Sequence, residues 1–314
     1  MKPERRQPPE EVRRRVARYG LSRWIAAAPA VIGSLLILLL ASTALGRWSA
    51  LLLLTWAVCA ALVTSRVGER VVVRAAYGFR RPNARQAAAL RPAWVTALRV
   101  TGTKAGDVNL YVQTARKPNA YAAGGRSIAV TTRVLQDHES GRLPEDLLVG
   151  VLVHELGHHA TGATRLMLLL SWLAAPWRLT TRLLIGLAHS LASRQPRARL
   201  AVVLVAGLAV AVTHALQQGQ WLVGGVLTFV GLAAVLCPVA HAAINRRSEF
   251  AADRFAADHG LAWELAAALQ VMDDGRRVVR GWAPQLLVSH PPLEQRIDAL
   301  LAARATEPVT VQRP

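Results

Sequence analysis

The sequence is poor in cysteine, in aromatic residues and in acidic residues. Its two cysteines, Cys59 and Cys237, both fall inside apolar blocks, which argues against a disulfide framework and against cysteine as a metal ligand. Phe, Tyr and Trp make up only 5% of the 314 residues. They are not interleaved with basic residues, as they would be on many nucleic-acid-binding surfaces. With 19 Asp and Glu against 38 Lys and Arg, the large positive charge needs another explanation.

The basic residues gather beside long apolar blocks. The clusters are Arg5, Arg6, Arg13, Arg14, Arg15, Arg18 and Arg23, then Arg66, Arg70 and Arg74, then Arg194, Arg197 and Arg199, and finally Arg246 and Arg247. Such clusters are typical of the cytoplasmic ends of membrane spans and of contact with anionic lipid. We therefore expect the lipid bilayer as a partner, and no nucleic acid.

Apolar residues reach 53% of the chain and the mean hydropathy is +0.27. Four blocks are long enough, or nearly so, to cross about 30 Å of hydrocarbon. They run from Trp24 to Gly46, Ser49 to Ser65, Leu200 to Leu216 and Trp221 to Ile244. Short links join them into two hairpins. A further apolar stretch, 165–194, is interrupted by Arg178 and Arg182, so we expect interfacial helices there.

One motif carries chemistry. His154, Glu155 and His158 form the pattern HExxH in a segment whose start at Pro144 and Glu145 predicts a helix. Residues four apart share a helical face, so both histidines can reach one Zn²⁺. Glu155 then lies beside the metal-bound water and can act as general base.

A third ligand is suggested by an absence. Between Glu155 and Glu249 there is no Asp or Glu at all, and Glu249 follows the fourth apolar block, where the chain returns to the cytoplasmic side. A catalytic zinc usually has three protein ligands, so we expect one Zn²⁺ per chain held by His154, His158 and Glu249. Asp253, one helical turn further on, is placed to accept the second N–H of a zinc histidine.

The blocks divide the chain into five segments. We expect a basic cytoplasmic segment (1–23), a transmembrane hairpin (24–65), the first part of a catalytic domain (66–198), a second hairpin (199–244) and the second part of that domain (245–314). Strand patterns near Asn109 and Ser127 predict a small β-sheet. The expected fold is a mainly α integral membrane protein, with about four transmembrane helices and a cytoplasmic zincin-like catalytic domain.

The sequence resembles the HtpX-like membrane zinc endopeptidases, a family whose wider group includes the CAAX prenyl endopeptidases. The resemblance covers most of residues 20–304. Besides HExxH and Glu249 to Asp253, it rests on Asn119 to Gly124, which resembles the family's NAFATG-type segment, and on His290, Pro291, Pro292 and Arg296. The sequence departs from the family at Tyr121, Ala123 and Ser248, none of which is a proposed ligand.

The resemblance implies a membrane endopeptidase of the gluzincin type, acting on misfolded or membrane proteins in quality control. The expected location is the bacterial inner membrane, with the active site facing the cytoplasm. The edge strand at Asn119, Ala120 and Tyr121 would pair with an extended substrate. His290 would donate to the oxyanion, and Arg296 would anchor its segment to a carboxylate; Tyr121 is the alternative donor.

Three other readings stay open. A CAAX-type processing enzyme would need a chamber for a lipidated tail, for which four spans are few. An intramembrane-cleaving protease would carry HExxH inside a span, whereas Arg142, Glu145 and Asp146 precede this helix. An inert membrane scaffold with a retained metal site would have no need of Glu155. Oligomeric state and specificity cannot be inferred from these patterns.

Overall fold

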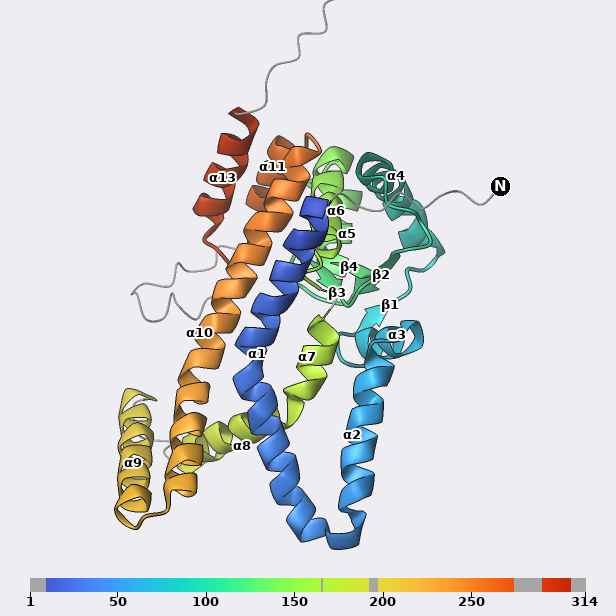
Figure 1. Cartoon of the computed structure of the whole chain (residues 1–314). Coiled ribbons are helices and arrows are strands. Elements are labelled where there is room, and N and C mark those ends of the chain that lie inside the picture. Colours follow the sequence, from blue (N-terminus) through green and yellow to red (C-terminus); the bar gives the residue numbers. More distant parts are fainter. Residues whose placement is uncertain (1–9, 165, 192–196, 274–289, 306–314) are drawn as a thin grey trace, which may run out of the picture. The chain divides into compact units, whose positions relative to one another are not determined.

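The computed structural model describes residues 10–164, 166–191, 197–273 and 290–305 (Figure 1). The chain is mainly helical and contains one small sheet. In order, its elements are α1 (Glu10–Leu45), the 3₁₀ helix η1 (Gly46–Trp48), α2 (Ser49–Val63), α3 (Arg66–Ala75), β1 (Phe79–Arg80), α4 (Ala84–Thr101), β2 (Asn109–Gln113), β3 (Ala120–Ala123), β4 (Ser127–Thr131), α5 (Thr132–Glu139), α6 (Glu145–Ala160), α7 (Met167–Leu173), α8 (Ala175–Leu191), α9 (Arg197–Gln217), α10 (Trp221–Asp258), α11 (Ala262–Met272) and α13 (Leu293–Ala305).

The described residues form two compact units. Unit 1 takes in Met1–Ser22, Leu62–Leu168 and Ala242–Pro314, and unit 2 takes in Arg23–Ala61 and Leu169–His241. The whole sheet and helices α3 to α6 belong to unit 1, whereas α1 and α10 each contribute residues to both units. The five-segment division expected from the sequence stays a prediction.

Unit 2 is assembled around small residues. A Cβ at Gly33 of α1 would overlap the ring of Trp177 in α8, so the indole sits directly on this glycine. The backbone N–H of Trp177 also donates to Oγ of Ser34 at 3.0 Å. The buried residues around this contact are Ala30, Ala174 and Ala233. Close contacts through small residues are typical of helices that pack in membranes.

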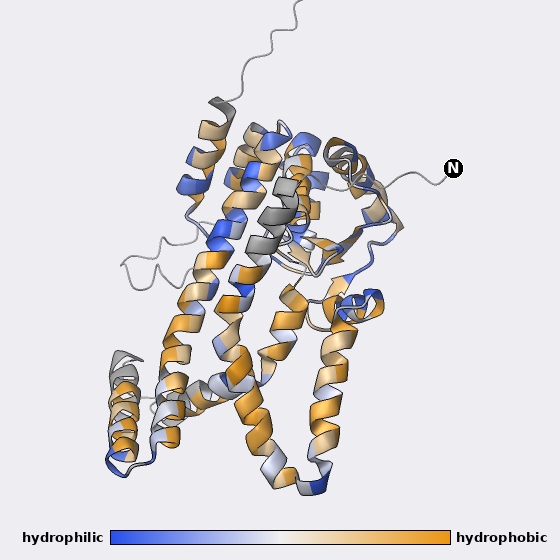
Figure 2. Ribbon diagram, viewed as in Figure 1, coloured by the Kyte–Doolittle hydropathy of each residue, from blue (hydrophilic) through white to orange (hydrophobic). Residues whose placement is uncertain are grey.

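Two stretches of the described chain are long and apolar enough to cross a membrane, so the expectation of four separate spans is wrong. They are Gly20–Val63 and Trp221–Asp258. The first two predicted blocks form one helical tract that turns at η1, and both it and α10 are strongly apolar (Figure 2). The third block lies in α9 (Arg197–Gln217), of which Val205–Gln217 is the apolar part that the structure describes fully.

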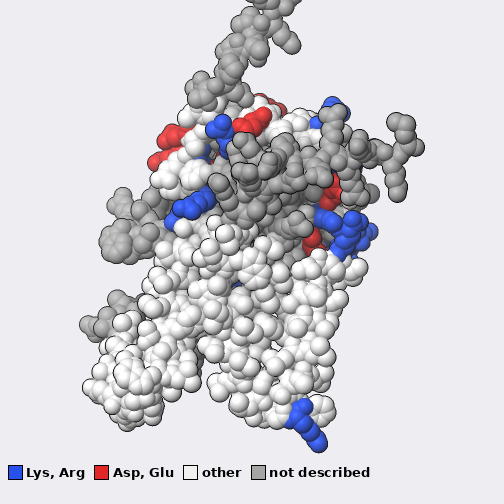
Figure 3. Space-filling view, viewed as in Figure 1, with Lys and Arg blue, Asp and Glu red and all other residues white. Residues whose placement is uncertain are grey.

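The stretch 165–194 forms α7 and α8, and neither is a candidate span among the described residues. Large apolar side chains of α8 are exposed at Leu179, Leu183, Leu184 and Leu187. Over α9 and most of α2, the face seen in Figure 3 likewise carries almost no charged atoms. The interfacial position of 165–194 stays a prediction.

The sheet of unit 1 has four strands in the order β1-β2-β4-β3. β2 and β4 are parallel, and Asn109 pairs with Ser127, whereas β1 and β3 run antiparallel to their neighbours. The strands expected near Asn109 and Ser127 are therefore present. β3 lies at an edge and is in contact with α6.

Both faces of the central strands are covered, which explains why every residue of β4 is buried. Ile128 and Val130 of β4 belong to the core shared with α4 and α6, and Ala129 belongs to a second cluster with Val73 and Phe79. Alternate residues of a strand point to opposite faces. The apolar residues Ile128, Ala129 and Val130 therefore contribute side chains to both hydrophobic clusters.

Helix α6 runs through the middle of unit 1. It follows Pro144, has Glu145 and Asp146 in its first turn and histidines in its last, as the helix dipole favours. Leu148 to His158 are all buried. Two glycines of α6 allow neighbouring helices to approach it closely. A Cβ at Gly150 would lie 2.9 Å from the backbone N of Leu265 in α11, and a Cβ at Gly157 would lie 3.0 Å from Cβ of Phe255 in α10.

Helix α10 corrects a second expectation. The fourth apolar block was expected to end as a span at Ile244, ahead of the segment that carries Glu249. They form a single helix, Trp221–Asp258, with Pro238 inside it. Arg246 and Arg247 end the apolar run without interrupting the helix, because arginine is a good helix former.

We predict that Gly150→Ala destabilises the protein by about 1–3 kcal/mol, since the new methyl group would press on the backbone of α11. Thermal unfolding in detergent measures the effect. Gly186→Ala in α8 is the control, because a Cβ there meets open space and alanine favours a helix over glycine. A Gly150→Ala protein as stable as the control would contradict the tight contact.

Candidate active site

Three side chains from two helices of unit 1 converge on one point. His154 and His158 lie on adjacent turns of α6, with ring centroids 4.8 Å apart, and Glu249 reaches them from α10. Nε2 of His154 is 3.6 Å from one oxygen of Glu249, and Nε2 of His158 is 3.6 Å from the other.

These distances suit a tetrahedral metal ion. Two ligand atoms bound at about 2.0–2.1 Å are about 3.3–3.4 Å apart, close to the observed 3.6 Å. All three ligand atoms of His154, His158 and Glu249 lie within 4.8 Å of one another. Two imidazoles and one carboxylate are also the donor set that zinc favours at catalytic sites. The residues present therefore fit Zn²⁺.

Both histidines have a partner on α10 for the ring nitrogen that points away from this centre. Nδ1 of His154 is 2.9 Å from Oδ1 of Asp253, within hydrogen-bonding distance although the ring N–H is not well aligned with the oxygen. Nδ1 of His158 is 3.2 Å from Oγ of Ser248. Such partners fix the ring orientation and leave each Nε2 facing Glu249.

The two rings differ in their electrostatic surroundings. Burial lowers the pKa of His154, but the carboxylates of Asp253 and Glu249 outweigh it and raise the pKa to about 10. Burial, followed by the charge on His154, lowers the pKa of His158 to about 3. The carboxylates that favour a proton on His154 favour a metal cation at Nε2 for the same reason.

Arg296 of α13 ties the carboxylates together. Its Nε and Nη2 donate to the two oxygens of Asp253 at 2.8 and 2.6 Å, a bidentate pair, and its Nη1 is 3.2 Å from Glu249. The guanidinium is buried among them. This ion pair holds α13 against α10, although the two helices are far apart in sequence.

Glu155 is buried beside the histidines, yet its carboxylate forms no hydrogen bond with any described residue. Burial raises its pKa to about 7, against the opposing effect of a charged His154. A carboxylate with this pKa can both accept and return a proton near neutral pH.

His290 also reaches the site. Its Nδ1 lies 3.4 Å from an oxygen of Glu249, while 57% of its side chain stays exposed. It precedes Pro291 and Pro292, a dipeptide that favours extended backbone, and then α13 begins. An exposed imidazole beside buried ligands is accessible to a bound substrate.

The segment Asn119 to Tyr121 leads into β3, the edge strand. Oδ1 of Asn119 accepts from the backbone N–H of Ala120, whose side chain is buried in the core below α6. Tyr121 packs near Phe79, with ring centroids 6.4 Å apart, on the other face of the sheet. Its hydroxyl makes no hydrogen bond with a described residue, and the role of Tyr121 as the alternative oxyanion donor stays a prediction.

Two contacts were not expected from the sequence. Ser248 was noted only as a departure from a resemblance, although its position directly before Glu249 was a signal that it lies near the ligands. His159, the residue after the motif, is half-buried, and its Nδ1 lies 2.8 Å from Oγ1 of Thr164.

Residues 85–304, more than two thirds of the chain, match peptidase family M48. The chain belongs to peptidase family M48. The matched region contains every residue of the site described above, and M48 membership supports a metallopeptidase with a His154, His158 and Glu249 metal cluster. A search of curated proteins finds no match.

We predict that Glu249→Ala lowers zinc affinity, because it removes one of three converging ligand atoms. Zinc content after dialysis against a weak chelator measures it. The matched control is Asp258→Ala, which removes an exposed carboxylate from the same helix. Equal zinc content in the two variants would place the third ligand elsewhere.

Proposed function

We propose that this M48 protein is an HtpX-like zinc endopeptidase of the gluzincin type, embedded in a membrane. The observation that carries the proposal is the convergence of His154, His158 and Glu249 beside Glu155, a carboxylate that makes no hydrogen bond within the described part of the chain. Such a set is what metal-assisted peptide hydrolysis requires.

In this proposal His154, His158 and Glu249 hold one Zn²⁺ per chain, and the ion, when bound, supplies Lewis-acid chemistry to the water and the scissile carbonyl. Glu155 takes a proton from the attacking water and returns it to the leaving amine. Its pKa of about 7 suits both transfers. Asp253 and Ser248 keep the two imidazoles in place throughout.

His290 is the proposed donor to the oxygen that becomes negative on the substrate. It is the exposed polar group next to Glu249, and a donor aimed at the developing charge stabilises the transition state. Arg296 holds α13, and with it His290, through Asp253. The proposed role of Arg296 is therefore positioning.

The free edge of β3 is the proposed binding surface for an extended polypeptide. β3 is paired on one side only, with β4, and lies against the helix that carries the histidines. Backbone pairing at Asn119 to Tyr121 gives affinity with little demand on side chains. Loose specificity of this kind suits misfolded or membrane proteins as substrates.

For location we propose the bacterial inner membrane, with the site on the cytoplasmic side. Two candidate spans, Gly20–Val63 and Trp221–Asp258, support membrane insertion. The orientation rests on basic residues: Arg66 and Arg70 follow Gly20–Val63, and Arg246 and Arg247 follow the apolar part of α10.

The activity can be tested with the full chain in neutral detergent and casein as substrate. We predict zinc-dependent hydrolysis that a chelator abolishes and added zinc restores. Glu155→Gln should keep its zinc but lose turnover, since Glu155 is the base and not a ligand. Undiminished hydrolysis by Glu155→Gln would refute the mechanism.

His290→Ala should lower kcat about a hundredfold or more, because loss of one oxyanion donor commonly costs about 2.7–4 kcal/mol. Tyr121→Phe is the comparison, and near wild-type kcat is expected because Tyr121 packs beside Phe79. The reverse outcome, a large loss only in Tyr121→Phe, would assign the donor to the strand.

A further inference from the structure

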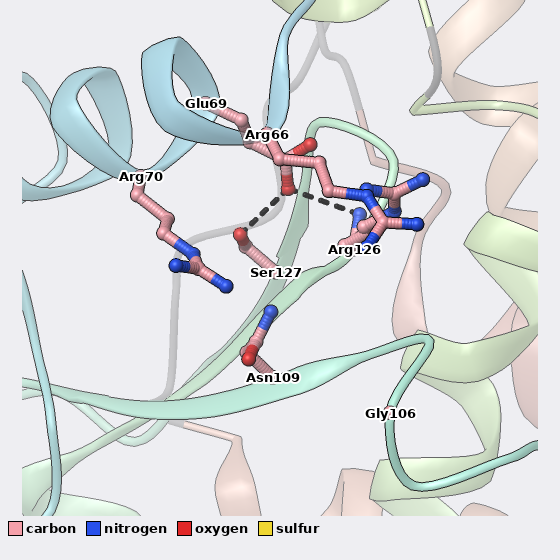
Figure 4. Close-up of a pocket in the computed structure, with 7 residues that line it drawn as sticks. All are labelled: Arg66, Glu69, Arg70, Gly106, Asn109, Arg126 and Ser127. Atoms are coloured by element: carbon pink, nitrogen blue, oxygen red, sulfur yellow. Dashed lines mark hydrogen bonds between the residues drawn. The ribbon is translucent and has the colours of Figure 1, made fainter.

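A second polar site lies in unit 1, apart from the metal cluster. It is a small open hollow (Figure 4), lined by Arg66, Glu69, Arg70, Gly106, Asn109, Arg126 and Ser127. Arg66 and Arg70 come from the first turns of α3, Asn109 begins β2, and Arg126 lies in the turn between β3 and β4. Three guanidinium groups thus line one small hollow.

The one carboxylate of this lining is already occupied. Glu69, only 8% exposed, accepts from the backbone N–H groups of Gly125 and Arg126, both at 3.0 Å, and from the hydroxyl of Ser127 at 2.7 Å. These bonds hold the β3–β4 turn against α3. They engage both oxygens of Glu69, and no ion pair joins this carboxylate to Arg66, Arg70 or Arg126.

Some exposed arginines of unit 1 pair with acids: Arg85 with Glu139, Arg133 and Arg142 with Asp137, and Arg254 with Asp258. By contrast, the guanidinium groups of Arg66, Arg70 and Arg126 form no ion pair or hydrogen bond with any residue that the structure describes. Figure 4 shows the ends of Arg66 and Arg126 on one side of Ser127 and Asn109, and the end of Arg70 on the other. With three guanidinium groups and one carboxylate, the lining of the hollow is net positive.

The position of Arg66 along the chain points to the source of an anion. Arg66 is three residues beyond Val63, where the candidate span Gly20–Val63 ends. Three residues extend at most about 11 Å, so the backbone of Arg66 lies within that distance of the span's end. Phosphate groups of lipids lie at this depth, where the apolar core of a bilayer gives way to water.

We propose that this hollow binds a phosphate group, supplied by the head group of an anionic phospholipid. Arginine binds phosphate through two parallel N–H···O bonds, and the amide of Asn109 adds a further donor. A bound phosphate would also contact the β3–β4 turn, which Glu69 fixes, and would thereby link the bilayer surface to the base of the edge strand.

The test is a titration of the full-length chain, in neutral detergent micelles, against fluorescently labelled phosphatidylglycerol, followed by fluorescence anisotropy. The double variant Arg66→Gln/Arg70→Gln should bind at least about tenfold more weakly, because charge-assisted hydrogen bonds to phosphate are lost. The control, Arg74→Gln/Arg80→Gln, removes the same charge from α3 and β1 outside the hollow and should stay within about threefold of wild type. Arg126→Gln, a single change on a different element, should also weaken binding.

Unlabelled phosphatidylglycerol should displace the probe, and phosphatidylcholine at the same concentration should not. An equal loss of affinity in the two double variants would mean general charge attraction and would overturn the site. Displacement by inorganic phosphate as effective as that by the lipid would overturn the lipid source. Thermal unfolding of each variant separates lost binding from lost fold.

Discussion

The geometry of the candidate site depends on how closely α6 approaches α10. At Gly157 the gap is so small that even a Cβ would lie 3.0 Å from Phe255. Because the helices meet here, Glu249 comes within 3.6 Å of both His154 and His158. A larger residue between the histidines would widen the gap and separate the ligand atoms. The glycine inside HExxH is therefore as much a part of the site as its polar neighbours.

A second constraint is the balance of charge in the core of unit 1. Burying a charged group is unfavourable unless it is paired. Asp253 is 2% exposed and Arg296 9% exposed, and they satisfy each other through two bonds. Arg296 also lies against Glu249, which faces His154. Removing any one of these groups would leave a buried partner without compensation, so the network supports both the fold and the orientation of the ligands.

The metal ligands could be anticipated because helical spacing and the acid-free interval from 156 to 248 leave few choices. The alternating and apolar runs near Asn109 and Ser127 likewise indicated strands. The number of spans could not be counted from hydropathy alone, since a turn such as Gly46–Trp48 can lie within one apolar helical tract. Periodicity within α10 gave no boundary either, because arginines continue a helix as readily as leucines.

Some contacts between distant residues were beyond sequence reasoning. Nothing local indicates that Glu69 would accept a hydrogen bond from the turn at Gly125, because such a pair is created by packing. The sequence also could not show on which face of the sheet Tyr121 lies. A strand presents alternate residues to opposite faces, and the register with β4 decides which of them face the helices.

The placement of the ligands has a consequence for the unfolded chain. Two ligands come from α6 and the third from α10, with residues 159–248 in between. A cation held by all three would act as a cross-link that closes this long loop, and it would reduce the entropy of the unfolded chain in the way a disulfide does. In a protein whose two cysteines are both free, zinc supply would then govern how long the folded chain persists.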